Sequence, residues 1–193
     1  MKTLFLRLLF AHITATFLIV PAYAQEQERL AEIHEGLTKT DLTGDGVPEI
    51  VLKAWRENFN AHGYYVIQLL KLRGNSTNSF DIIGIDYGSD VPIPFAHELQ
   101  SRSTADRITQ DQRFVYMGKH AFLIEATLSQ KGSCCADVPV TFRFFKMSYN
   151  REGVPGTTQY YFELTKEWTT ENAYPDLNQA FRQNSEKLIS ELQ

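Results

Sequence analysis

The sequence predicts an α+β domain, a mainly antiparallel β-sheet of about seven strands with a short helix before the sheet and another after it. Runs of β-branched and aromatic residues recur through the middle of the chain, separated by glycine, proline, asparagine and serine. Helical spacing of apolar residues occurs only in the stretches that flank these runs. Strands that follow one another directly, with helices kept at the ends, are typical of α+β domains.

The start of the chain has the composition of a secretory signal peptide. Lys2 and Arg7 supply its positive charge, an apolar run follows, and Ala22-Tyr23-Ala24 matches a cleavage site of small residues. The apolar run is shorter than the roughly 20 residues of a membrane-spanning helix. We therefore expect residues 1–24 to be removed, residues 25–193 to form a single globular domain, and the protein to reach the periplasm without a membrane span.

The net charge of the chain argues against two classes of partner. The formal net charge is −4, and loss of the leader would remove basic residues but no acidic one. Nucleic acids and anionic lipid surfaces select basic patches. We therefore expect no nucleic acid partner, and a small molecule or an envelope protein is the candidate partner.

The first element after the leader is expected to be a short amphipathic helix over residues 25–37. Its apolar residues recur at intervals of three and four, which places them on one helix face. These residues are Leu30, Ile33, His34 and Leu37. Gly36 and Thr38 indicate where the helix ends.

About seven strands are expected after this helix, because each run is rich in aromatic and β-branched residues. They cover residues 50–55, 64–72, 80–86, 113–117, 121–128, 138–149 and 158–168. Most of the connections are short and contain turn residues, which predicts a meander of antiparallel neighbours.

Residues 87–110 have weak periodicity and contain Gly88, Pro92 and Pro94. A connection of this length is often a lid or a binding loop. A short helix over residues 96–102 is the alternative.

Pro175 can begin a last helix, since proline needs no N–H partner in the first turn. The apolar residues that follow have helical spacing and predict a buried face. They are Leu177, Ala180, Phe181, Leu188, Ile189 and Leu192.

The most specific motif is Asp41-Leu-Thr-Gly-Asp-Gly-Val-Pro-Glu49, which offers the oxygen ligands that calcium prefers. The candidate ligands are the side chains of Asp41, Thr43, Asp45 and Glu49 and the carbonyl of Val47. Gly44 and Gly46 can adopt the positive φ that a loop needs to wrap around an ion. Calcium is therefore the candidate cofactor.

Two observations limit this interpretation. An EF-hand carries a bidentate glutamate at position 12 of its loop, and this loop has Leu52 there. The loop instead resembles the calcium loops of FG-GAP and VCBS repeats, which run straight into a strand. A polar turn that binds no ion is the alternative, because Thr43 is a poorer ligand than the usual aspartate. The motif occurs once, so the sequence does not predict a propeller or a solenoid.

A second polar cluster lies between the first two expected strands and is a candidate ligand pocket. Its residues are Trp55, Arg56, Glu57, Asn58, Asn60 and His62. Arg56 could clamp a carboxylate with its two-donor edge. A solvated hairpin connection with one packed aromatic ring is the alternative.

Cys134 and Cys135 are the two cysteines of the chain, and they are adjacent. In an oxidising compartment thiols tend to pair, so a strained disulfide between neighbours is expected. Two reduced thiols are the alternative. A zinc site is not expected, because zinc ligands are usually spaced two to four residues apart.

The sequence lacks the G-x-S-x-G elbow of α/β-hydrolases and the S-x-x-K motif of serine β-lactamases. We therefore expect that the protein is not an enzyme.

The leader, the Asp41–Glu49 motif and the following Arg-Glu-Asn-Phe-Asn-Ala-His together resemble the CarG-type carbapenem self-resistance proteins of Gram-negative bacteria. The similarity is specific over residues 41–65. It implies a periplasmic, non-catalytic protein that protects a cell from a carbapenem by binding. The main alternative is a calcium-dependent exported module of the FG-GAP or VCBS type that contacts a protein or an envelope polymer.

Overall fold

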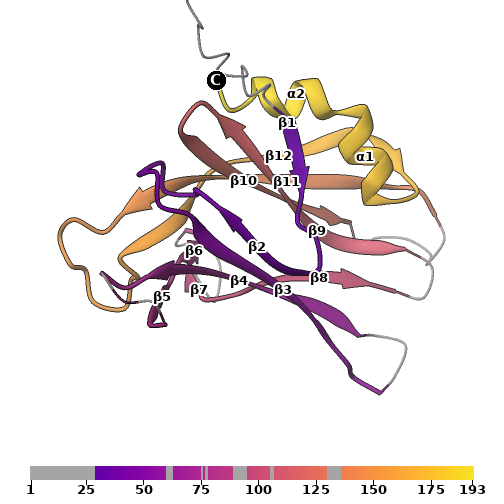
Figure 1. Cartoon of the computed structure of the whole chain (residues 1–193). Helices are drawn as coiled ribbons and strands as arrows, with labels where there is room; N and C mark the ends of the chain where they lie inside the picture. Colours follow the sequence, from indigo (N-terminus) through magenta and orange to yellow (C-terminus); the bar gives the residue numbers. More distant parts are fainter. Residues whose placement is uncertain are drawn as a thin grey trace, which may run out of the picture.

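Most of the described chain forms one 12-stranded sheet, with two short helices at its C-terminal end (Figure 1). This computed structural model describes residues 29–59, 63–74, 76, 78–88, 95–104, 107–129 and 136–193. The strands are β1 (Arg29–Glu32), β2 (Gly36–Thr40), β3 (Glu49–Arg56), β4 (Tyr64–Leu72), β5 (Phe80–Ile82), β6 (Gly84–Asp86), β7 (Phe95–Ala96), β8 (Leu99–Ser103), β9 (Ile108–Met117), β10 (His120–Leu128), β11 (Val138–Tyr149) and β12 (Tyr160–Tyr174). The helices are α1 (Leu177–Gln183) and α2 (Ser185–Ser190).

The sheet is mixed rather than antiparallel throughout. Its main path runs β2-β3-β4-β8-β9-β10-β11-β12-β6-β7, with β1 paired to β9 and β5 paired to β4. Neighbouring strands are antiparallel except β6, which runs parallel to β12. The expectation of a β-rich chain with a C-terminal helical segment is confirmed, but the expectation of about seven antiparallel strands is wrong. The meander fails because β6 joins the far edge of the sheet instead of staying beside its sequence neighbours.

Two hydrophobic clusters hold the sheet together, one on each face of β9 to β12. On one face Ile67 and Leu69 of β4 pack with Phe145 of β11 and with β12. On the other face Phe144 packs with Leu177 and the rest of the helical segment. Phe144 and Phe145 belong to different clusters because successive side chains of a strand point to opposite faces.

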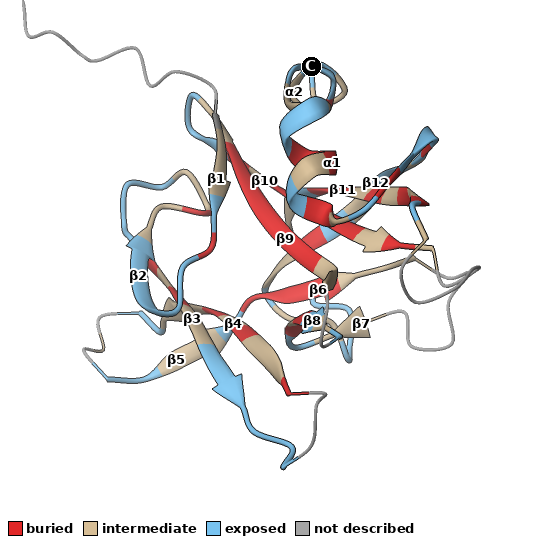
Figure 2. Ribbon diagram, turned by 90° about the vertical axis from the view of Figure 1, so that its right-hand side faces the viewer, coloured by how far each residue is buried: buried red, intermediate tan, exposed pale blue. Residues whose placement is uncertain are grey.

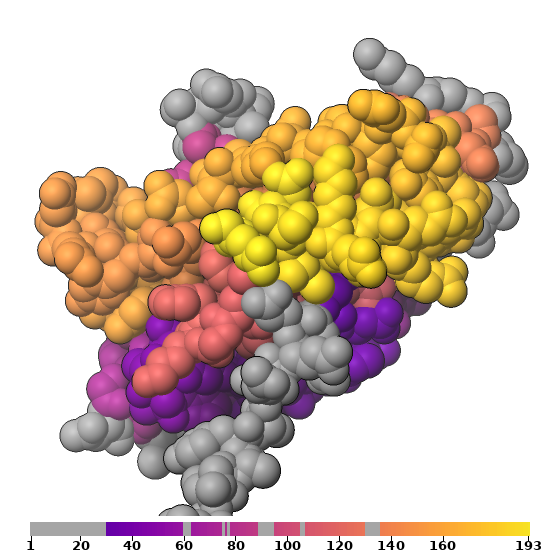
Figure 3. Space-filling view, turned by 90° about the horizontal axis from the view of Figure 1, so that it is seen from above, coloured from indigo at the N-terminus to yellow at the C-terminus, as the bar shows by residue number. Residues whose placement is uncertain are grey.

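The burial of the strands follows from this double packing. Figure 2 shows β9 and β10 buried along much of their length, whereas β2 at the edge of the sheet is mostly exposed. Figure 3 shows the yellow C-terminal helices lying over the orange strands that they cover. Within the described residues, no helix has the length and apolar character that crossing a membrane requires.

The prediction of a short N-terminal helix over residues 25–37 is wrong. Its described part forms β1 and β2, which pair with β9 and β3. Gly36 has a φ of +97°, outside the helical region, and Leu37 of the expected apolar face is exposed. Backbone pairing to two existing strands outweighs the weak helical preference of so short a stretch.

Residues 87–110 also contain strands that the sequence did not reveal. The alternative helix over residues 96–102 is wrong, because β7 and β8 occupy that stretch and β8 pairs with both β4 and β9. Leu99 and Ser101 are buried and Gln100 is less so, which is the two-residue period of a strand.

The helical segment begins at Leu177 rather than at Pro175. Asp176 caps it, because its carboxylate accepts a hydrogen bond from the Gln179 N–H at 2.8 Å. Asn184 divides the segment into α1 and α2. Four members of the predicted apolar face are buried, namely Leu177, Ala180, Phe181 and Leu188.

Replacing Phe142 by alanine should lower the free energy of unfolding by about 3–5 kcal/mol, because it empties space in the core. Phe142 is fully buried, and its ring contacts those of Trp168 and Phe181. Phe59→Ala is the matched control, since Phe59 is 95% exposed and its loss should change stability by no more than about 0.5 kcal/mol. Urea denaturation measures both variants, and equal losses would contradict the described core.

Candidate functional site

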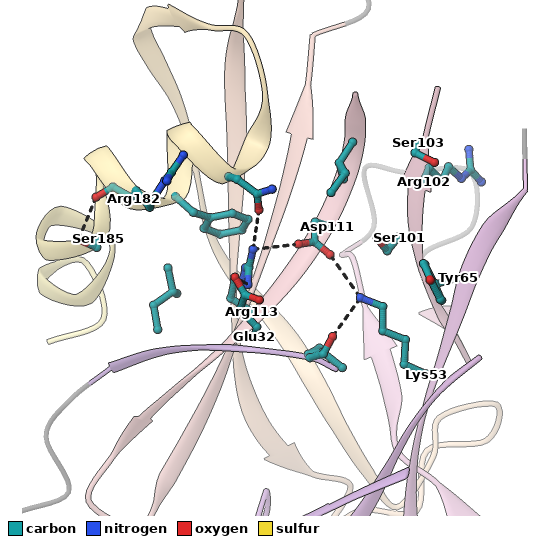
Figure 4. Close-up of a pocket in the computed structure, with 15 residues that line it drawn as sticks. Glu32, Lys53, Tyr65, Ser101, Arg102, Ser103, Asp111, Arg113, Arg182 and Ser185 are labelled. Atoms are coloured by element: carbon teal, nitrogen blue, oxygen red, sulfur yellow. Dashed lines mark hydrogen bonds and ion pairs between the residues drawn. The ribbon is translucent and has the colours of Figure 1, made fainter. Parts of the chain in front are cut away.

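A cavity of about 630 Å³ lies where β3, β4 and β8 approach β9, β1 and the helical segment (Figure 4). Its walls combine aliphatic residues of β1 and β9 with the rings of Tyr65 and Phe181. Six charged residues line it as well: Glu32, Lys53, Arg102, Asp111, Arg113 and Arg182. Ligand pockets commonly have volumes of about 300–1,000 Å³ and a small number of convergent polar groups.

The strands place polar residues in this cavity by simple alternation. Lys53, Tyr65 and Ser101 each lie two residues from a core residue of the same strand, so they continue the inner face of the sheet. Those core residues are Val51, Ile67 and Leu99. Polar side chains replace apolar ones at this end of β3, β4 and β8, and the cavity opens there.

Arg113 of β9 is the most buried cation of the cavity, with only 6% of its side chain exposed. One terminal nitrogen contacts the Glu32 carboxylate. The other donates to Asn178 Oδ1 at 2.9 Å and lies 3.4 Å from Asp111 Oδ2. The guanidinium stands over the Phe181 ring, 5.0 Å from its centroid. Burial lowers the pKa of Arg113 to about 10, so the side chain stays charged at neutral pH.

One donor of Arg113 is unused. Its Nε is buried and has no hydrogen-bond partner within the described part of the chain. A buried polar group without a partner is costly, and such groups are rare in folded proteins. The orphaned donor indicates that the surroundings of this guanidinium are incomplete.

Lys53 and Asp111 form the second charged pair of the cavity. The Lys53 ammonium donates to the Ile33 carbonyl at 3.0 Å, lies 4.0 Å from Asp111 Oδ1 and stands over the Tyr65 ring. Burial raises the pKa of Asp111 above its ordinary value, and the charge of Lys53 and hydrogen bonds from the Gln112 backbone and Ser101 oppose that rise.

The cavity carries an excess of positive charge. Four of its ionisable residues are basic and two are acidic, although the whole chain has a net charge of −4. A concave site with an excess of one sign concentrates ions of the opposite sign. The cavity is therefore suited to an anionic ligand.

The Asp41–Glu49 loop brings its predicted ligands together at a different place. Carboxylate oxygens of Asp41, Asp45 and Glu49 lie within 4.8 Å of one another, and Thr43 Oγ1 donates to Glu49 Oε1 at 3.0 Å. Asp41 accepts the N–H groups of both loop glycines, at 2.7 and 2.8 Å. Val47 is exposed, and its N–H donates to Asp45 at 2.8 Å.

A lysine that the motif does not contain supplies a cation to this loop. The Lys71 ammonium lies 2.5 Å from Glu49 Oε1, 2.8 Å from Asp45 Oδ2 and 3.1 Å from Thr43 Oγ1. Desolvation opposes a higher pKa for Lys71, but hydrogen bonds and charges of Asp45 and Glu49 raise it above its usual value. Calcium binding by the loop stays a prediction, and a calcium ion would have to compete with this ammonium.

Gly44 is essential to the loop for a steric reason. Its φ is +77°, and a Cβ atom there would lie 2.4 Å from the Lys119 carbonyl oxygen in the β9–β10 turn. The glycine therefore allows both the left-handed turn and the close approach of two backbones.

The predicted pocket residues Trp55 to Asn58 lie at the end of β3 and do not line the cavity, although the Trp55 ring packs against that of Tyr65, with centroids 5.0 Å apart. Trp55 Nε1 donates to Glu57 Oε2 at 3.2 Å, and Glu57 also accepts the Asn58 N–H at 2.9 Å. Arg56 donates to the hydroxyl of Tyr64. Most of these contacts stay within the cluster, and the ligand cradle remains a prediction.

Four predicted site residues lie outside the described part of the chain. They are Asn60, His62, Cys134 and Cys135. The expected leader, residues 1–24, lies outside it too.

Sequence reasoning missed the cavity, although β9 carried a signal. Asp111, Gln112 and Arg113 precede Phe114 and Val115 within one strand, and all of them are buried. Asp and Arg are rarely buried in full unless they are paired. Adjacent charges inside a buried strand can therefore indicate an internal ionic site.

Comparisons with known proteins agree with the described fold. A family model described as "CarG-like: Carbapenem resistance protein CarG-like" matches residues 33–183, which include most of the residues that line the cavity. A solved structure titled "Crystal structure of CarG" is similar with a TM-score of 0.65 and 18% sequence identity, over 79% of this chain and 93% of that chain. At that identity the likeness shows a shared fold. No curated protein matches the chain.

Replacing Lys71 by methionine should make the Asp41–Glu49 loop depend on calcium. The change leaves the buried Glu49 without its cation, and loss of one partner of a buried ion pair costs about 3 kcal/mol. Added calcium should restore the melting temperature of Lys71→Met, because in this variant the ion no longer competes with an ammonium. The melting temperature of the wild type should rise less.

Lys146→Met, at an exposed position of β11, is the matched control and should respond to calcium as the wild type does. Melting curves with calcium and with a chelator measure the difference. A Lys71→Met protein whose melting temperature is the same with calcium and with a chelator would show that the loop is only a turn.

Proposed function

Because the chain belongs to the CarG-like family of carbapenem resistance proteins, we propose that it is an exported, periplasmic protein that binds a carbapenem without cleaving it. The family ties the chain to carbapenem resistance. The composition of residues 1–24 supports export, and the charged cavity supports binding of a small anion.

The observation that carries the proposal is the excess of basic residues in a cavity of ligand size. The compact bicyclic nucleus of a carbapenem carries one carboxylate, which is anionic at neutral pH. Lys53 and Arg113 offer charged donors to the carboxylate, and the rings of Tyr65 and Phe181 offer apolar surface to the rest of the ligand. A cavity of about 630 Å³ suits a ligand of this size.

The arrangement of groups in the cavity supports binding rather than hydrolysis. Acyl transfer needs a nucleophile beside an effective base. Ser101 hydrogen-bonds Asp111, but the Asp111 carboxylate is already engaged by the Lys53 ammonium at 4.0 Å and by the Arg113 guanidinium at 3.4 Å. The carboxylate acts here as a counter-ion.

One observation favours a second function, an interaction module. The outer face of β2 to β5 carries a row of apolar residues on directly paired strands: Leu37, Ile50, Leu52, Leu70 and Ile82. Leu37 and Ile82 are exposed. A contiguous apolar patch of this kind is typical of a protein contact surface.

Expression of the full chain in a carbapenem-susceptible Gram-negative host should raise the minimum inhibitory concentration of a carbapenem. Lys53→Gln should remove much of that gain, because it deletes a charge of the cavity but keeps a donor for the Ile33 carbonyl. Loss of one charge-assisted contact weakens binding about tenfold or more. Lys146→Gln is the matched control and should protect like the wild type.

Protection that survives Lys53→Gln but is lost in Ile82→Gln would favour the interaction module instead. Thermal unfolding of each purified variant shows whether a loss of protection reflects a loss of folding.

Incubation of a carbapenem with excess purified protein should return the antibiotic intact. The ultraviolet absorbance of the β-lactam chromophore measures this, and it should decay at the rate seen in buffer or more slowly. A faster decay that Ser101→Ala abolishes would identify an enzyme and contradict the non-catalytic proposal.

A further inference from the structure

The partners of Arg113 differ sharply in their exposure. The side chain of Arg113 is 6% exposed and that of Asp111 is 9% exposed, whereas that of Glu32 is 61% exposed. Glu32 therefore reaches from solvent to a buried guanidinium. An exposed carboxylate gains little by forming an ion pair, since water solvates it well already.

Glu32 also lies at the end of a short strand. It is the last residue of β1, a strand of four residues that pairs with β9. Among the ionisable residues of the cavity, Asp111 sits on the same strand as Arg113 and is a fixed counter-ion. Glu32 is the replaceable one.

From this asymmetry we infer that Arg113 is the carboxylate-recognition point of the cavity, and that Glu32 occupies it in the free protein as an internal carboxylate that an anionic ligand displaces. The inference rests on the proposed function for the identity of the ligand. It adds the group of the ligand that is recognised and the residue that competes with it.

The local charges select a monoanion. Within the ion-pair network of Arg113, loss of Glu32 leaves the two positive charges of Arg113 and Lys53 and the one negative charge of Asp111, which is a single positive charge to be balanced. A carboxylate matches both that charge and the planar two-donor edge of a guanidinium.

The displaced side chain has room to move. Glu32 also lines a second cavity, of about 1,020 Å³, which lies on the other side of β1 beside β2 and the β9–β10 turn. Rotation of Glu32 toward this second cavity opens the contact to Arg113 without unpairing β1 from β9. Ligand binding then replaces the Glu32 carboxylate by the ligand carboxylate, so the charge of the Arg113 guanidinium is balanced before and after binding.

Removal of the competing carboxylate should strengthen the binding of a simple carboxylate. Glu32→Gln should bind benzoate about tenfold more tightly than the wild type, as measured by calorimetry at constant ionic strength. Benzamide, the neutral analogue of the same shape, should bind the wild type and Glu32→Gln with equal affinity. Glu152→Gln, in the exposed β11–β12 turn, makes the same change of net charge and should leave benzoate binding unchanged.

Replacing Arg113 by lysine in the Glu32→Gln background keeps the positive charge but removes the planar two-donor edge. It should abolish the tenfold gain, and thermal unfolding identifies any variant that has not folded. Equal benzoate affinity in the wild type and Glu32→Gln, or a gain that benzamide shares, would overturn the inference.

The same variants separate this inference from the proposed function. A benzoate gain in Glu32→Gln, together with no carbapenem binding by any variant, would support the recognition point and overturn the carbapenem proposal. Carbapenem binding that is equal in the wild type, Glu32→Gln and Glu32→Gln/Arg113→Lys would support the proposed function and overturn the recognition point.

Discussion

The buried charge of Arg113 is the constraint on which this end of the molecule depends. A guanidinium in the interior must be compensated by partners that reach it, and here they come from three separate elements. Glu32 comes from β1, Asp111 from β9 itself, and Asn178 with Phe181 from α1. The positions of the first strand and of the helical segment are therefore tied to one side chain. The same requirement keeps the space around it polar, which is why a charged cavity persists at this end of the sheet.

The sequence predicted the elements whose residues carry their own signal. Strands β4 and β11 were predicted with the bounds that the structure has, because long runs of aromatic and β-branched residues mark them. Strands β1, β2, β7 and β8 have five residues or fewer, and backbone pairing with distant strands determines their structure. The parallel pairing of β6 with β12 joins residues far apart in the chain, and no local pattern encodes it.

The candidate sites show the same division between local and distant signals. The spacing of Asp41, Asp45 and Glu49 was enough to predict that their carboxylates meet, because one loop carries all three. Lys71, 22 residues beyond Glu49, could not be assigned to that loop before the pairing of β3 with β4 was known. The cavity draws its charged residues from β1, β3, β8, β9 and α1, so its composition emerges only from the fold. Helices, strands and motifs were thus predictable where a single segment of the sequence determines them. Sites that several distant segments form together were not predictable.

The central claim is that an intact carbapenem binds in the charged cavity through its carboxylate. A crystal structure of the protein grown with a carbapenem tests it most directly. The account predicts density for an unopened β-lactam between Tyr65 and Phe181, with the ligand carboxylate on the Arg113 guanidinium and Glu32 turned away. Density for the ligand outside this cavity, or for a ring-opened product, would contradict it.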